Sequence, residues 1–244
     1  MRARRVGLVC AGGVTHSFLA RLPAVMASLG PLKATSYRVA RRISNSLHAG
    51  RAVESYSALA SCDAIWVAVR EPALDRIVAA LPPGIPLIVC DTPRDSSRMP
   101  AARAATLQAI PSDERTLVAE GDVSVLRYLR RVAVSDRRKL IEIAPASKTL
   151  FLAGVNLATH LALPWIAAAV ESLRAAGFSR SQATRLVEEL GGRTLRSYGK
   201  AGAKAWNPSA GVGLRRALDV NLPEPRLADL YRTGIERALR FFGE

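Results

Sequence analysis

The stretch from Arg4 to Gly30, RRVGLVCAGGVTHSFLARLPAVMASLG, constrains the fold of this chain more than any other. It opens with a short apolar run, Val6 to Cys10, of the kind that forms a buried strand. Small residues follow at Ala11-Gly12-Gly13, and apolar residues then recur at roughly helical spacing, at Val14, Phe18, Leu19 and Leu22. The pattern predicts a strand, a tight turn and a helix.

A strand, turn and helix of this kind open a dinucleotide-binding fold, in which the turn and the first N–H groups of the helix hold a pyrophosphate. The usual fingerprint is G-x-G-x-x-G, and here Cys10 takes the first glycine position, Gly12 the second and Thr15 the third. The motif alone is a weak signal. We expect the residues of the turn to hold the pyrophosphate: Ala11, Gly12, Gly13, Val14 and Thr15.

Arginines follow the second predicted strand, which spans Leu32 to Tyr37. In this fold an acidic residue at the end of that strand binds the ribose 2′-hydroxyl of NAD, whereas arginine accommodates the 2′-phosphate of NADP. The chain has Arg38 and Arg41 there and no acid, which favours NADP. The alternative is that both arginines merely begin a solvated helix running to Leu47, and the sequence leaves the two interpretations open.

Further strands and helices alternate through the first 144 residues. Asp63 to Val69 is a predicted buried strand, and its carboxyl end should place Val69 and Arg70 beside the cofactor ribose. A helix over 74–81 and a strand over 86–91 follow, and Thr92 to Ser112 is polar with a possible short helix over 101–107. Strand, helix and strand are predicted again over 116–122, 125–132 and 140–143. These repeats predict a mostly parallel sheet covered by helices on both faces.

Beyond Ala144 the pattern is helical throughout. Residues 146–177 are strongly apolar with a break expected at Pro164, and Ser179 or Ser181 caps the next helix. Gly191-Gly192 should end that helix, turns should form at 207–208 and 211–213, and a last helix should start after Pro223 or Pro225. We therefore expect an α/β domain over residues 1–144 and an all-α domain over 145–244.

The composition narrows the partners of the chain. Its 35 Lys and Arg outnumber its 20 Asp and Glu, giving a net charge of +15 that favours anionic ligands. The arginines are scattered and few aromatics accompany them, so nucleic-acid binding is the weaker explanation. The three cysteines indicate a reducing, cytoplasmic location, the cysteines and histidines show no metal-ligand spacing, and the apolar runs predict no membrane span.

This layout resembles a bacterial family of Rossmann-like proteins with a C-terminal domain of unknown function, which are relatives of pyrroline-5-carboxylate reductase, ketopantoate reductase and the β-hydroxyacid dehydrogenases. The segments that carry the resemblance are VGLVCAGGVTHSFLARL, SCDAIWVAVRE, VAEGD, KTLFLAGVNLATHL and EELGGRTLRSYGKAG. The resemblance implies a Rossmann-type sheet domain followed by a helical substrate and dimerisation domain. It also implies an NADP-dependent oxidoreductase that transfers hydride between a nicotinamide and a small carbonyl, imine or hydroxy substrate held between the domains.

Three side chains on the long apolar segment are the catalytic candidates that this resemblance suggests. Lys148 would be the proton donor, and Asn156 and His160, one turn apart, would orient the substrate. Dehydrogenase relatives place lysine and asparagine four residues apart, whereas residue 152 here is leucine. The alternatives are an exposed lysine at a helix start, a hydrogen-bonded core amide and a packed histidine.

A second hypothesis comes from a different functional class. The altered glycine fingerprint and the missing lysine–asparagine spacing would also suit a non-catalytic binding or regulatory protein that keeps the fold without turnover. The apolar excess of 150–170 and the relatives predict a homodimer in either case. The substrate itself is beyond what these patterns specify.

Overall fold

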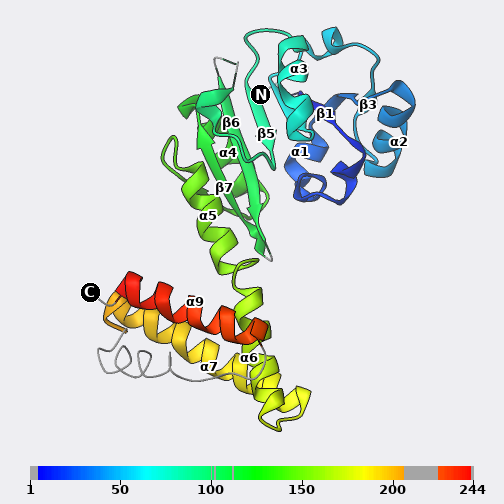
Figure 1. Cartoon of the computed structure of the whole chain (residues 1–244). Helices are drawn as coiled ribbons and strands as arrows, with labels where there is room; N and C mark the ends of the chain where they lie inside the picture. The colour runs from blue at the N-terminus through cyan, green and yellow to red at the C-terminus, as the bar shows by residue number, and fades with distance from the viewer. Residues whose placement is uncertain (1–4, 100, 102, 112, 206–224, 243–244) are drawn as a thin grey trace. The chain divides into compact units, whose positions relative to one another are not determined.

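The computed structural model describes residues 5–99, 101, 103–111, 113–205 and 225–242. The chain forms two compact units, Met1–Ala153 and Gly154–Glu244, each of which is described by itself. The first unit, blue to green in Figure 1, is an α/β unit, and the described part of the second, green to red, is helical.

One eight-stranded sheet organises the first unit, in the order β3-β2-β1-β4-β5-β6-β7-β8. Only the β6–β7 pair is antiparallel, because these two strands form a hairpin. The predicted fold class, a mostly parallel Rossmann-type sheet followed by an all-α region, is confirmed. The strands are β1 (Val6–Cys10), β2 (Leu29–Lys33), β3 (Arg51–Ala52), β4 (Ala64–Ala68), β5 (Leu87–Cys90), β6 (Ala104–Ile110), β7 (Asp113–Gly121) and β8 (Lys139–Glu142).

Helices cover both faces of this sheet. One apolar core lies under α1, α2 and α4 and includes Trp66 and Ile88, and the other lies under α3 and includes Val67 and Val89. Alternate residues of the same buried strands therefore serve opposite cores. The helices and 3₁₀ turns of this unit are η1 (Gly12–His16), η2 (Phe18–Arg21), α1 (Pro23–Ala27), α2 (Tyr37–Leu47), η3 (Tyr56–Leu59), α3 (Glu71–Ala80), η4 (Ser96–Arg98) and α4 (Val123–Ser135).

The helix predicted after the glycine turn is wrong as one continuous element. Three short pieces, η1, η2 and α1, replace it. Ser17 has an extended backbone between the first two, and its hydroxyl donates to the carbonyl oxygen of Val14 (2.8 Å). Pro23 then starts the third piece, as a residue without an N–H can at the first helical position.

Two further predictions in the first unit need correction. The segment 101–107 was predicted as a short helix, but Ala104–Ile110 is strand β6, buried between its neighbours β5 and β7. Its alanines suit a helix in isolation, and the packing of both faces overrides that preference. The second strand, predicted over Leu32 to Tyr37, lies earlier, at Leu29–Lys33, so that Gly30 and Pro31 are part of it.

The second unit consists of helices whose boundaries largely follow their capping residues. Helix α5 (Lys148–Ala158) crosses the division between the units, and α6 (Leu163–Ala175) starts where Pro164 predicts a break. The predicted cap is confirmed, since the Ser179 hydroxyl accepts the N–H of Gln182 and the Gln182 side chain accepts the N–H of Ser179. The remaining elements are α7 (Arg180–Ala201), η5 (Gly202–Ala205) and α9 (Pro225–Phe242).

The helix end predicted at Gly191-Gly192 is wrong. Helix α7 is 22 residues long and continues through both glycines to Ala201. Glycine weakens a helix interior by about 1 kcal/mol and does not by itself end it. The predicted turns at 207–208 and 211–213 lie outside the described residues.

Within the described part of the chain, one stretch is long and apolar enough to cross a membrane, contrary to the sequence expectation. It is Lys148–Ala175, and its apolar window is not buried. This stretch comprises α5, a turn and α6. Length and composition do not assign it to a membrane, because core helices of soluble proteins have the same properties.

Candidate cofactor site and a buried polar cluster

The turn after β1 offers an open approach to the backbone. Gly12 and Gly13 are exposed, and a Cβ atom added at either would meet no described atom within 4 Å. The N–H of Ala11 donates to the carbonyl oxygen of Ala68 (3.1 Å), which ties the turn to the end of β4. Val14 anchors the turn in the core, and Thr15 is half-buried. The five residues predicted to hold a pyrophosphate therefore lie together at the carboxyl end of β1.

The helix behind this turn is short. Because η1 is a five-residue 3₁₀ helix, it lacks the extended dipole of the long helix that the fingerprint normally precedes. An anion here would depend on individual N–H groups, which the open glycines leave accessible.

Arginines cover one side of α2 beside the end of β2. Arg38 and Arg41 are exposed and, together with Tyr37, Arg42 and Asn45, line one shallow depression. Neither Arg38 nor Arg41 has an ion-pair partner among the described residues. The Ser36 hydroxyl caps the helix by accepting the N–H of Val39 (3.2 Å). Two guanidinium groups are thus available to an anion at this helix.

The carboxyl end of β4 lies next to that of β1 in the sheet. Val69 and Arg70 follow its last residue, with Val69 half-buried and Arg70 exposed. The strand order changes direction between β1 and β4, the topological switch point at which open α/β sheets bind their ligands. The residues predicted to border the ribose therefore occupy the expected edge of the sheet.

A buried polar cluster surrounds the predicted Lys148, and the sequence analysis did not predict its partners there. Lys148 is only 1% exposed, and its Nζ atom donates to Thr106 Oγ1 (2.7 Å). The Thr106 hydroxyl in turn donates to Glu120 Oε1 (2.7 Å), and Glu120 is fully buried. Ser96 adds two bonds to the same carboxylate, from its N–H (2.8 Å) and its hydroxyl (2.5 Å). We refer to Lys148, Thr106, Glu120 and Ser96 as the lysine cluster.

Burial dominates the electrostatics of this cluster. Desolvation lowers the pKa of Lys148, and the negative charges of Glu120 and Asp91 oppose that shift. Desolvation also raises the pKa of Asp91, partly offset by the Lys148 ammonium. One signal in the sequence could have revealed the cluster: Glu120 lies inside the strand predicted over 116–122, and a charged group that a strand buries needs a partner.

The other two catalytic candidates lie in the second unit, past the division within α5. Asn156 and His160 are both exposed, and His160 Nδ1 lies 3.4 Å from Asn156 Oδ1. The Thr159 hydroxyl donates to the carbonyl oxygen of Val155 (2.7 Å), one turn earlier. The predicted one-turn proximity of Asn156 and His160 is therefore present, while Lys148 belongs to the first unit.

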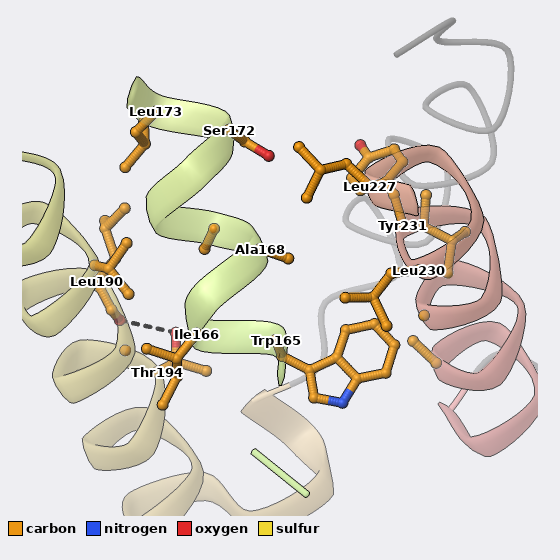
Figure 2. A pocket seen from close by; sticks show the side chains of 16 residues that line it. Trp165, Ile166, Ala168, Ser172, Leu173, Leu190, Thr194, Leu227, Leu230 and Tyr231 are labelled. Carbon is orange, nitrogen blue, oxygen red and sulfur yellow. Dashed lines mark hydrogen bonds between the residues drawn. The ribbon is translucent and has the colours of Figure 1, made fainter. Parts of the chain in front are cut away.

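Within the helical unit, α6, α7 and α9 line an open groove with a volume of about 710 Å³. Figure 2 shows side chains from all three helices directed into it, with Trp165 and Leu230 on one side and Leu190 on the other. The lining is mostly apolar; the dashed bond in the view runs from the Thr194 hydroxyl to the carbonyl oxygen of Leu190 (3.0 Å). Among the described residues of the whole chain, no three Cys, His, Asp or Glu side chains are grouped to hold a metal ion.

Comparison with solved structures gives matches over nearly the whole chain. An imine reductase from Myxococcus stipitatus in complex with NADP⁺ has a TM-score of 0.67 and 12% identity, covering 97% of this chain and 94% of that one. Protein TM1727 from Thermotoga maritima has a TM-score of 0.66 and 16% identity, covering 98% of each chain. Pyrroline carboxylate reductase from Plasmodium falciparum with NADP bound has a TM-score of 0.58 and 14% identity, covering 100% of each chain.

The chain has the fold of the Rossmann-type NADP reductases. The resemblance stated from the sequence is confirmed at this level. No family model and no curated protein matches the chain. One imine reductase variant with the same fold was solved with NAD⁺, so the fold by itself does not select the cofactor.

The residues present fit a dinucleotide on two observations of this structure. The glycines of the β1 turn leave room for a ligand to approach the backbone, and α2 presents arginines without ion-pair partners on the adenosine side. When bound, NADPH would supply a hydride. The residues that would hold it are the turn, the α2 arginines and the end of β4.

Proposed function

We propose that this protein is an NADP-dependent oxidoreductase acting on a small carbonyl, imine or hydroxy compound. The observation that carries the proposal is the pairing of an open glycine turn after β1 with exposed arginines on α2, on a fold shared with NADP reductases. Two solved structures with this fold, an imine reductase and a pyrroline carboxylate reductase, hold NADP⁺ or NADP. The cofactor choice rests on the arginines, because the fold also occurs with NAD⁺.

The cofactor contacts follow from the edge of the sheet. The N–H groups of the β1 turn would bind the pyrophosphate, Arg38 and Arg41 the 2′-phosphate, and Val69 with Arg70 would border the ribose. Asn156 and His160 remain the residues proposed for substrate orientation, and Lys148 remains the lysine proposed to assist proton transfer. Because Lys148 is buried, it would influence the reaction through the groups around it.

Replacement of Arg38 tests the cofactor assignment. Arg38→Ala should weaken NADPH binding by about 10- to 100-fold, the size of a lost charge-assisted hydrogen bond, while NADH binding changes little. Titration calorimetry of the variant with both cofactors measures the difference. Arg76→Ala is the matched control, because Arg76 is also an exposed arginine on a helix of the same unit. Equal losses for NADPH and NADH would contradict the role of Arg38.

We also propose that the protein is a cytoplasmic homodimer. Large apolar side chains of α5 and α6 are exposed, among them Leu150 (74%) and Leu163 (60%), and a second copy would cover them. The three cysteines are all free and buried, as suits a reducing compartment. Light scattering at micromolar concentration should give the mass of two chains, and Leu163→Asp should reduce it. A monomeric mass for the unmodified protein would contradict the dimer.

A further inference from the structure

Asp91 lies at the edge of the sheet where the reacting end of a dinucleotide would be. It directly follows β5, the strand next to β4, at the carboxyl edge. The α2 arginines mark the adenosine side, beyond β1 in the opposite direction. A dinucleotide that crosses the switch point between β1 and β4 therefore extends its nicotinamide half toward β4 and β5. This inference rests on the proposed function.

Asp91 is held rigidly at this edge. Its backbone is left-handed (φ 52°), a conformation that aspartate adopts more readily than most residues other than glycine. Its N–H donates to the carbonyl oxygen of Leu107 (3.0 Å), which keeps it in line with β6. The next residue, Thr92, is buried, and its hydroxyl donates to Glu71 Oε2 (2.7 Å). Bonds on both sides thus fix the position of the Asp91 backbone while the residue remains exposed.

A second anchor holds the segment that follows. The Arg94 guanidinium pairs with Glu71 at 2.6 Å and with Asp75, and the Arg94 N–H donates to Thr92 Oγ1 (3.1 Å). Glu71 therefore binds two residues of the segment from the start of α3. Rigid placement of this kind is what a group in contact with substrate requires.

The lysine cluster supplies the charge behind Asp91. Lys148 donates to Thr106, which lies on β6 opposite Val89, two residues before Asp91 on the neighbouring strand. The buried Lys148 ammonium therefore lies beside the end of β5, and its charge acts on the Asp91 carboxyl. The acidic side chains around Lys148 are Glu120, Asp91 and Asp95, with the Cys90 thiol beside them. Asp95 Oδ2 is buried with no hydrogen-bond partner in the described structure. Asp91 is the exposed member of this set, while Asp95 and Glu120 are buried.

We propose that Asp91 is the residue that donates the proton to the substrate, and that Lys148 is a positioning residue that acts through Asp91. Proton donation requires contact with the substrate and is assigned to the exposed Asp91, whereas the buried Lys148 has the positioning role. Asp91 can touch a substrate at the sheet edge, and Lys148 can act on it only by its charge. Asp91 was not among the residues that the sequence pattern singled out.

The proposed reduction needs one hydride and one proton. The cofactor of the proposed function would supply the hydride, and Asp91 would supply the proton. When bound, NADPH would supply the hydride that adds to the carbon of a C=N or C=O bond. The O–H bond of the protonated Asp91 carboxyl breaks as its proton goes to the nitrogen or oxygen, so that an amine or alcohol and NADP⁺ are formed. The carboxylate left behind is stabilised by the Lys148 ammonium and takes a proton from water, which reaches it because the residue is exposed.

The first test measures the Asp91 carboxyl without any reaction. Carbon-13 labelling of aspartate allows the carboxyl signals to be followed against pH in the protein saturated with NADP⁺, and Asp91→Asn identifies the Asp91 signal. Asp91 should titrate at a higher pH than the ordinary exposed aspartates, because desolvation raises its pKa. Lys148→Gln removes the ammonium and should move this titration to still higher pH.

Glu120→Gln should shift the Asp91 titration in the opposite direction. This variant keeps the test valid if Lys148→Gln does not fold. It removes the negative charge that acts most strongly on Lys148, so the ammonium is less compensated and should move the Asp91 titration to lower pH. A wild-type Asp91 signal that titrates with the other aspartates, or shifts in the wrong direction in the folded variants, would overturn the inference.

The second test follows NADPH oxidation with 1-pyrroline and, in parallel, pyruvate as probes. Asp91→Asn should lower kcat by about 100-fold or more, as loss of a general acid does, with NADPH affinity unchanged within twofold. The wild-type rate should fall as pH rises through the Asp91 pKa, and the variant should lose this dependence. Asp113→Asn, an exposed aspartate of the β6–β7 hairpin, is the control.

The outcomes separate this inference from the proposed function. Turnover of either probe with Asp91→Asn retaining more than a third of wild-type kcat would overturn the role of Asp91 alone. Absence of NADPH binding, or binding without oxidation by either probe, would remove the proposed reaction and this inference with it.

Discussion

The two units differ in how completely they bury their own apolar side chains. The first unit buries its apolar side chains in two cores, with Trp66 in one and Val89 in the other. In the described part of the second unit only Ala183 and Ile235 are buried among the apolar residues. Leu195 (75% exposed) and Phe241 (81%) illustrate the contrast. The sheet unit is therefore self-sufficient, whereas the helical unit is built to pack against a further surface, which we propose to be a second copy.

A glycine substitution in the sheet unit should give the largest loss of unfolding free energy, and it tests how tightly this unit is packed. Gly121 has φ 140°, and a Cβ there would collide with the carbonyl oxygen of Ala104 and with Cα of Ala105. Gly121→Ala should therefore cost about 4 kcal/mol or more of unfolding free energy, since both the backbone and the packing are violated. Urea unfolding measures the loss. Gly12→Ala, which meets no described atom within 4 Å, is the control and should change stability by less than about 0.5 kcal/mol.

A pair of apolar truncations compares the two units directly. Ile88→Ala should cost about 3 kcal/mol, because the side chain is fully buried in the core under α1, α2 and α4 and its removal leaves a cavity. Leu195→Ala should cost less than about 0.5 kcal/mol under dilute conditions, where no partner covers the side chain. Similar losses for the two variants at low concentration would break the distinction drawn between the units.

The smallest expected change in stability is a gain, from a glycine substitution in the helical unit. Gly199 lies inside α7, and an added Cβ meets no described atom within 4 Å. Gly199→Ala should stabilise the protein by about 0.5–1 kcal/mol, because alanine loses less backbone entropy in a helix. Thermal unfolding should show a small rise in Tm. A fall would mean that a further surface packs closely against this glycine.

The buried thiols offer an independent check on the first unit. Burial raises the pKa of Cys10 to about 12 and that of Cys90 well above its ordinary value. At pH 8 both thiols should be protonated and unreactive toward a disulfide reagent in the folded protein, and should react once urea unfolds it. Rapid reaction in the native state would show that the core opens.

The sequence predicted the fold well where local and tertiary preferences agree. The apolar run of β4 and the capping pair Ser179 and Gln182 specify their elements locally, and both are present. Strand β6 was mistaken for a helix because its alanines become a strand only through burial against β5 and β7. The continuous helix after the glycine turn failed because Ser17 and Pro23 divide it into three pieces.

The sequence likewise predicted only some residues of the candidate site. Residues that follow strands directly, such as Gly12 and Arg70, could be placed from the order of elements, because the carboxyl ends of parallel strands share one edge. The contacts of the lysine cluster could not be predicted from the order of elements. Lys148 and Thr106 are 42 residues apart, and only the folded sheet brings them within hydrogen-bonding distance. The presence of a glutamate at position 120 in a buried strand was the one local sign of it.

Titration calorimetry of the unmodified protein with NADPH and then NADH, at moderate salt to suppress nonspecific attraction to a chain of net charge +15, tests the proposed function most directly. The open glycine turn and the α2 arginines predict tight binding of NADPH and markedly weaker binding of NADH. Binding of neither cofactor would contradict the assignment, and would favour a protein that keeps the reductase fold without its cofactor.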